Sequence, residues 1–233
     1  MGEKTRWFQD RQREAYYRKA KKEGYRARSA YKIQQIHERF TVVKPGECVV
    51  DLGAAPGGWS QMLVELVGAK GLVVGVDLQR IRPMPGAKFL QGDFTKKETQ
   101  ERMEKILADG GHKTVDAVVS DMAPDMSGNY ELDQVRSVQL CEIALAFADK
   151  HLRKGGAFVC KVFEGADFPP FREQVKRRFK RMAQFHPPAS RKTSSEVYLI
   201  GKHYLGPGEG GAVDDDEDDD PVARAVRLEN EAE

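Results

Sequence analysis

Short apolar runs rich in β-forming residues alternate along the chain with segments of helical periodicity, and this alternation most constrains the fold. The runs predict strands at residues 47–52, 71–78, 88–90, 115–120, 156–162 and 196–203. The periodic segments predict helices at residues 29–40, 59–67, 95–108, 131–152 and 168–179. Strands that alternate with helices form parallel sheets with right-handed crossovers. We therefore predict an α/β, Rossmann-like domain with a mostly parallel central sheet and helices on both faces.

Charge is distributed unevenly along the chain. Residues 207–233 hold 11 acidic residues and two Arg, a net charge of −9, so residues 1–206 carry +11. Within that basic body, residues 1–32 carry a net charge of +7. A body this basic favours a polyanionic partner such as a nucleic acid, although a solvated basic surface has the same composition.

Composition divides the chain into three predicted parts. We expect a basic, nucleic-acid-binding extension over residues 1–28 and a folded α/β domain over residues 29–206. Residues 207–233 are expected to form an acidic, disordered tail, because a run of seven acids at 214–220 cannot bury apolar area. We interpret this tail as a solubilising extension, with a competitor of non-specific RNA as the alternative.

Nothing in the sequence predicts export or membrane insertion. No apolar run approaches 18 residues, and the charged N-terminus lacks the apolar stretch of a secretory signal. Cys48, Cys141 and Cys160 each lie in an apolar-patterned segment, which predicts buried thiols rather than disulfides or a metal site. We therefore expect a cytoplasmic protein that holds no metal.

A glycine-rich turn, Asp51-Leu-Gly-Ala-Ala-Pro-Gly-Gly58, joins the first predicted strand to a helix. Glycines let the backbone turn tightly and approach a ligand closely. The next strand ends in Asp77, where a carboxylate can bond ribose hydroxyls, and Asp93 follows the third strand, where it could meet an adenine amino group. Each acid alone could be a cap or a turn residue. Acids at three strand ends together predict a nucleoside-containing cofactor at the carboxyl ends of the strands.

The spacing of the turn discriminates between cofactors. Ala55 occupies the second glycine position of the dinucleotide motif, and the chain holds no P-loop, so nucleoside triphosphate hydrolysis is not expected. The form Asp51-x-Gly53-x-x-x-Gly57 instead resembles motif I of S-adenosylmethionine-dependent methyltransferases. We therefore predict S-adenosyl-L-methionine as the cofactor and a methyltransferase version of the Rossmann-like fold.

Six stretches closely resemble, in order and spacing, the FtsJ/RrmJ family of RNA ribose 2′-O-methyltransferases. They are residues 50–61, 91–94, 120–124, 126–128, 161–163 and 195–198. The resemblance runs from about Gly24 to Gly201, and no motif position departs from the family pattern, which gives the acidic tail no role. It implies 2′-O-methylation of a ribose, expected to be a uridine in large-subunit ribosomal RNA. It also implies a monomer that works within the large ribosomal subunit.

The resemblance also implies site residues. The family's catalytic set of Lys, Asp, Lys and Glu falls on Lys32, Asp121, Lys161 and Glu196. Its cofactor contacts fall on Gly57, Trp59, Asp77, Asp93 and Asp121. Taken singly, each lysine or glutamate would more often be a solvated surface charge than a catalytic group.

The chemistry suits these residue types. A sulfonium is already a strong methyl donor, so the difficulty lies in the weakly acidic ribose hydroxyl. Lysine is a poor base at its ordinary pKa of about 10.4, and burial or a second cation lowers that pKa. Either a neutral Lys161 takes the proton, oriented by Lys32 and Glu196, or a charged Lys161 stabilises the developing alkoxide. Asp121 is expected to hold Lys161 and the methyl donor in line.

The basic N-terminus is expected to bind RNA, extended by Lys176–Arg181 and Arg191–Lys192. Five aromatic residues interleave this N-terminal patch and would either stack on bases or pack the segment onto the body. They are Trp7, Phe8, Tyr16, Tyr17 and Tyr25.

Alternative functions are ribose methylation of a tRNA anticodon loop, messenger-RNA cap methylation, a non-catalytic ribosome assembly factor and, most distantly, an NAD-dependent reductase.

Overall fold

The computed structural model describes residues 14–190 and 195–208. Within them, seven strands form one sheet in the order β3-β2-β1-β4-β5-β7-β6. The strands are β1 (Cys48–Leu52), β2 (Leu72–Asp77), β3 (Ala87–Gln91), β4 (Val115–Ser120), β5 (Leu152–Phe163), β6 (Phe179–Phe185) and β7 (Glu196–Tyr204). Strands β1 to β5 pair in parallel, whereas β7 is antiparallel to both of its neighbours. The predicted Rossmann-like, mostly parallel α/β fold is confirmed.

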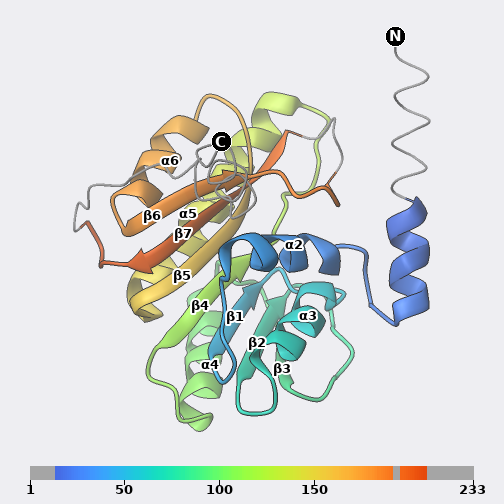
Figure 1. Cartoon of the computed structure of the whole chain (residues 1–233). Coiled ribbons are helices and arrows are strands. Elements are labelled where there is room, and N and C mark those ends of the chain that lie inside the picture. Colours follow the sequence, from blue (N-terminus) through green and yellow to red (C-terminus); the bar gives the residue numbers. More distant parts are fainter. Residues whose placement is uncertain (1–13, 191–194, 209–233) are drawn as a thin grey trace, which may run out of the picture.

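Helices cover both faces of this sheet (Figure 1). The labelled helices are α2 (Ala30–Phe40), α3 (Gly58–Val67), α4 (Lys97–Asp109), α5 (Tyr130–His151) and α6 (Phe168–Lys176). One hydrophobic cluster unites α2 and α3 with one face of the sheet, and a second cluster unites α4, α5 and α6 with the other face. The central strands are therefore buried on both sides, which is why they read as continuous apolar runs.

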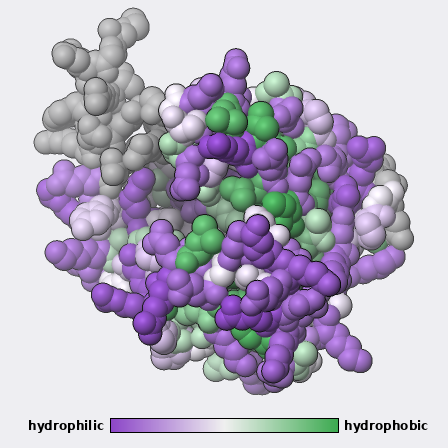
Figure 2. Space-filling view, turned by 180° about the vertical axis from the view of Figure 1, so that it is seen from behind, coloured by the Kyte–Doolittle hydropathy of each residue, from purple (hydrophilic) through white to green (hydrophobic). Residues whose placement is uncertain are grey.

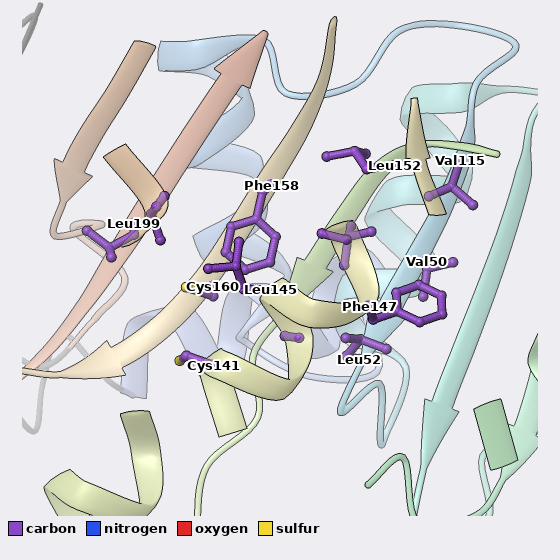
Figure 3. Close-up of a cluster of buried hydrophobic side chains, with 14 of the residues drawn as sticks. Val50, Leu52, Val115, Cys141, Leu145, Phe147, Leu152, Phe158, Cys160 and Leu199 are labelled. Carbon is purple, nitrogen blue, oxygen red and sulfur yellow. The ribbon is translucent and has the colours of Figure 1, made fainter. Parts of the chain in front are cut away.

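The larger cluster forms the core between the sheet and α5 (Figure 3). Val50 and Leu52 of β1 project into it beside Leu145 and Phe147 of α5, whereas Val49 projects to the opposite cluster. This alternation follows from the two-residue period of a strand. The same core holds Cys141 and Cys160, and all three cysteines are buried free thiols, as predicted.

Two local predictions were wrong. Helix α4 begins at Lys97 instead of residue 95, and its N-terminus has no side-chain cap, because the Thr95 hydroxyl bonds Asp93. The helix predicted over residues 168–179 ends at Lys176, and an unpredicted strand, β6, follows it. Strand β6 lies at the edge of the sheet, where half of its side chains face solvent. Its charged residues hid the alternation that a strand shows.

The N-terminal segment packs onto α2. Residues 14–23 are helical. The ring centroids of Tyr16 and Tyr25 lie 5.4 and 5.6 Å from that of Tyr31, and the Tyr31 hydroxyl donates to Glu23 at 2.7 Å. Tyr16 and Tyr25 therefore pack the segment onto the body, while Tyr17 is 62% exposed. Trp7, Phe8, Arg191, Lys192 and residues 209–233 lie outside the described part of the chain.

The strand order reverses between β1 and β4, and ligands of doubly wound sheets bind at the carboxyl ends of the strands beside such a reversal. The face of the molecule opposite to that of Figure 1 is largely hydrophilic, with small separate hydrophobic groups (Figure 2). No helix in the described ranges is long and apolar enough to cross a membrane.

Candidate active site

The glycine-rich turn lies at this reversal. The amides of Gly53 and Ala54 donate to the Val76 carbonyl at 2.9 and 3.1 Å, which ties the turn to β2. Gly53 has a φ of +76°, and a Cβ there would stand 2.5 Å from Cγ of Met122, just beyond β4. Only glycine fits both this backbone conformation and this space. The turn therefore has the tight, open backbone that close approach of a ligand requires.

Gly57 and Trp59 lie where the turn enters α3. Gly57 has a φ of +105° and precedes the first residue of the helix. A Cβ at Gly57 would lie 3.0 Å from Nη1 of Arg26, so the N-terminal segment passes directly beside the turn. The residue Trp59 is only 2% exposed, and its ring centroid lies 5.7 Å from that of Tyr198. The Trp59 ring therefore packs against Tyr198 in the protein interior.

Asp77 is the last residue of β2, and Asp93 follows β3, as predicted. Each carboxylate already accepts a hydrogen bond from at least one backbone amide. The carboxylate of Asp77 accepts the amide of Ala55 at 2.9 Å and that of Gln79 at 2.8 Å. One oxygen of Asp93 accepts both the amide and the hydroxyl of Thr95, and these bonds lower the pKa of Asp93. A carboxylate oxygen carries two lone pairs, so both acids retain capacity to accept from a cofactor.

Asp51, the first residue of the turn motif, is fully buried. One of its oxygens accepts the Ser60 hydroxyl at 2.6 Å, and the other has no hydrogen-bond partner among the described residues. Burial raises the pKa of Asp51 to about 7, and the negative charges of Asp121 and Asp77 act in the same direction. The Ser60 bond opposes this shift only in part.

The four predicted catalytic residues come together on the α2–α3 side of the sheet. Lys161, near the end of β5, lies with its Nζ 2.9 Å from Oδ1 of Asp121 and donates to the Asp121 carbonyl at 2.7 Å. Lys32 of α2 donates to Oε1 of Glu196 at 2.6 Å. Both lysines are buried, with exposed fractions of 7% for Lys161 and 8% for Lys32. They are therefore not the solvated surface charges that their residue type alone would suggest.

Tyr198 joins these two ion pairs into one chain of contacts. Its hydroxyl donates to Oδ1 of Asp121 at 2.8 Å and accepts from Nζ of Lys32 at 3.1 Å. Sequence reasoning did not select Tyr198 as a site residue. The signal was its place two residues after Glu196 on the same strand, which puts both side chains on one face. The resulting order is Glu196, Lys32, Tyr198, Asp121 and Lys161.

The opposite charges of the residues in this contact chain compensate one another. Burial alone would raise the pKa of Asp121, but Lys161, Lys32 and the hydrogen bonds from Lys161 and Tyr198 outweigh burial and lower it. Burial raises the pKa of Tyr198 well above its ordinary value, and the nearby charges of Asp121 and Glu196 raise it further. Asp121 is therefore an anion, and Tyr198 a neutral donor, near neutral pH.

A seven-stranded sheet with this order, an antiparallel β7 and a glycine-rich turn ending β1 are features of Rossmann-like, S-adenosylmethionine-dependent methyltransferases. The family comparison agrees with this class. The model of the family described as FtsJ-like methyltransferase matches residues 25–204, and the chain belongs to that family.

Relatives and solved structures extend this result. The chain is 52% identical over 194 residues to a protein of Methanothrix thermoacetophila named "Ribosomal RNA large subunit methyltransferase E", covering 83% of this chain and 74% of the relative. It is 49% identical over 196 residues to the protein of that name from Acinetobacter baylyi, covering 84% and 89%. A crystal structure from Plasmodium falciparum, provisionally described as a ribosomal RNA methyltransferase, superimposes with a TM-score of 0.70 at 27% identity. That match covers 78% of this chain and all of the other.

Proposed function

We propose that this protein transfers a methyl group from S-adenosyl-L-methionine to the ribose 2′-hydroxyl of a uridine in large-subunit ribosomal RNA. The observation that carries the proposal is the contact chain from Glu196 through Lys32, Tyr198 and Asp121 to Lys161, which lies beside the glycine-rich turn. Hydrolysis of a nucleotide or transfer of a hydride has no evident use for two buried lysines, each paired with its own carboxylate and linked through a tyrosine hydroxyl.

The residues around the turn fit the methyl donor. S-adenosylmethionine supplies an activated methyl group on a sulfonium. The turn at Gly53 and Gly57 presents backbone to it without side chains, and Asp77 offers acceptor oxygens for ribose hydroxyls. Asp93 offers an acceptor for the adenine amino group, and Trp59 contributes through its backbone because its ring is buried. The backbone amide of Asp121 donates to the carbonyl of Leu52 at 3.3 Å, just before the turn, and we expect its carboxylate to orient the donor.

Lys161 acts in this proposal as a charge stabiliser. An ammonium has three N–H donors. Two of them are directed at Asp121, one to the carboxylate and one to the carbonyl, which leaves one for the substrate oxygen. In this proposal Lys161 is held ready to donate as negative charge develops on the 2′-oxygen. Lys32 and Glu196 orient the hydroxyl, and Asp121 holds Lys161 in line with the donor.

The substrate is proposed from the relatives named large-subunit methyltransferases, together with the basic body of the chain. We further propose that the protein works as a monomer on the large ribosomal subunit. The second candidate function is the same reaction on a tRNA anticodon loop, because the contact chain supports the chemistry without selecting the RNA.

The test is transfer of labelled methyl from S-adenosylmethionine to unmodified large-subunit particles, bare ribosomal RNA and tRNA, with the product nucleoside identified. Lys161→Ala is the inactive variant. Lys150→Ala is its matched control, because Lys150 also pairs with a carboxylate, Glu104, but on the exposed surface of α5. We expect 2′-O-methyluridine in large-subunit RNA, lost in Lys161→Ala and kept in Lys150→Ala. Label in tRNA alone would move the substrate to the second candidate, and a base-methylated product would refute the proposed chemistry.

A further inference from the structure

A second polar pocket lies at the opposite end of the sheet from the contact chain. It has a volume of about 100 Å³ and is lined by Thr41 and Lys44 after α2, by Arg153 and Gly155 on β5, and by Lys202 and His203 on β7. Strand β7 links the two sites, since Glu196 belongs to the contact chain and His203 to the pocket. Seven residues at roughly 3.3 Å each separate the two by about 23 Å.

The size of this pocket restricts what can bind there. Sites for nucleosides and other small organic ligands generally occupy roughly 300 Å³ or more. A pocket of about 100 Å³ is too small for a nucleoside but accommodates a single phosphate-sized group. Its occupant is therefore a small ion or one charged group of a larger molecule.

The surroundings of the pocket are cationic. The lining includes two carboxylates, Glu47 and Asp116, and both pair with Arg153. Glu47 also accepts the backbone amide of Lys44 at 2.7 Å, and Asp116 that of Cys48 at 2.7 Å. The lining thus holds three cations, Lys44, Arg153 and Lys202, against these two carboxylates, which leaves an excess of one positive charge.

Further cations adjoin the pocket along the edge strand. Arg181 of β6 pairs in register with Lys202 of β7, and Lys180 precedes it. The pKa of His203 reflects how close these cations lie to it. Burial lowers its pKa, and the charges of four cations lower it further, namely Lys202, Arg181, Lys180 and Lys44. Repulsion among like charges gathered at one place costs free energy that an anion would relieve.

The backbone is unusual at this pocket too. Among the described residues other than glycine, only Thr41 and His203 have a positive φ, at 49° and 59°, and both line the pocket. A left-handed conformation is a genuine outlier for a β-branched residue such as threonine. Strain of this kind gathers at functional sites more often than elsewhere.

We propose that this pocket binds a backbone phosphate of the RNA substrate at a point remote from the methylated ribose. The inference rests on the proposed function, since it takes RNA as the substrate. A stacked strand advances about 3.4 Å per nucleotide, so about seven nucleotides separate the bound phosphate from the reacting ribose. The pocket thereby anchors RNA that extends past the target and favours long substrates over short ones.

The test compares two double variants that remove the same charge. Lys44→Gln with Lys180→Gln alters the pocket and its rim, where both lysines are exposed. Lys88→Gln with Lys105→Gln is the control, because these exposed lysines lie on β3 and α4 at the other edge of the sheet. Affinity is measured for the full chain with a long transcript of unmodified large-subunit ribosomal RNA and with a four-nucleotide fragment, over a range of salt concentrations.

We expect the pocket variant to bind the long transcript at least about 10-fold more weakly, with a log–log salt slope smaller by roughly 0.7, the change for one lost phosphate contact with a single strand. Its affinity for the short fragment should match that of the unaltered protein, and the control should change less than about twofold. Equal losses in both variants, or equal losses with both RNAs, would overturn the proposal.

Free phosphate is the competing source of the same chemistry. Inorganic phosphate could raise the melting temperature of the unaltered protein but not of the pocket variant, while both proteins bind the long RNA equally well. This outcome would identify a free anion, and not RNA, as the ligand of the pocket and would overturn the proposal. Methyl transfer is followed in parallel. If only remote binding is lost, the pocket variant still forms 2′-O-methyl product on short targets. If the proposed function is wrong, the unaltered protein does not form that product either.

Discussion

At the scale of single residues, the hydroxyl of Tyr198 is the link on which the contact chain depends. Tyr198→Phe removes the atom that bonds both Asp121 and Lys32 but keeps the ring packed against Trp59. A buried carboxylate then loses a donor, which costs roughly 1–3 kcal/mol. If about 1.4 kcal/mol of this cost falls on the transition state, the single-turnover rate of methyl transfer drops about 10-fold.

Tyr204→Phe is the matched control for this prediction. Tyr204 also lies on β7, and its hydroxyl donates to Oδ1 of Asp149 at 2.8 Å, but at the far end of the strand. Tyr204→Phe should lower the melting temperature by a similar amount and leave the rate unchanged. Equal rates for the two variants would remove Tyr198 from the mechanism.

Asp51 leads to a prediction about pH. Its pKa is raised from an ordinary 3.8 to about 7 by folding, so the folded protein binds more protons than the unfolded chain between these values. The contribution of Asp51 to stability therefore falls as pH rises from about 4 to about 7. The effect is at most roughly 4 kcal/mol, since one pKa unit corresponds to about 1.4 kcal/mol.

Asp51→Asn should remove this contribution. Chemical denaturation at a series of pH values should show the variant gaining stability relative to the unaltered protein from pH 5 to pH 8. The Ser60 hydroxyl keeps an acceptor in the asparagine, so the local hydrogen bond survives. A difference in stability that stays constant across this range would show that Asp51 does not titrate within it.

At the scale of elements, the glycine-rich turn is the most sensitive part of the fold. Gly53→Ala places a Cβ 2.5 Å from Met122 and adds strain at a φ of +76°. We expect a lower melting temperature and at least about 10-fold weaker binding of S-adenosylmethionine by calorimetry. Gly111→Ala separates the two causes, because Gly111 has a φ of +82° with open space around it. Gly111→Ala should lower the melting temperature only through the strain of a positive φ and should bind S-adenosylmethionine normally.

Elements also differ in how well their sequence predicts them. The central strands are buried on both faces and could be located from their apolar runs, and α2 and α3 from their periodicity. The edge strand β6 could not, because its solvent-facing residues Lys180 and Arg181 break the apolar run. Asp93 shows the same limit at a helix start. Its carboxylate engages Thr95, so α4 begins at Lys97, two residues later than predicted, without a side-chain cap.

At the scale of the whole molecule, the charge distribution determines how the protein meets RNA. Residues 1–206 carry a net charge of +11. We expect affinity for ribosomal RNA to fall by roughly 10³-fold between 50 and 200 mM salt if about six phosphates are contacted. Binding titrations at four or five salt concentrations measure this directly. An affinity that barely changes with salt would contradict a polyanionic partner.

The class of fold follows from local sequence patterns, because strand and helix periods, glycines and terminal acids are properties of consecutive residues. The sequence also placed Asp77, Asp93 and Asp121 at strand ends, since a strand end is a local feature. Only the tertiary structure decided which distant residues meet. Lys32 and Glu196 are 164 positions apart and touch because α2 packs across the face of the sheet where β7 begins. The partners of Tyr198 and the lining of the second pocket could not be predicted from the sequence for the same reason, since strand pairing and helix packing alone bring them together.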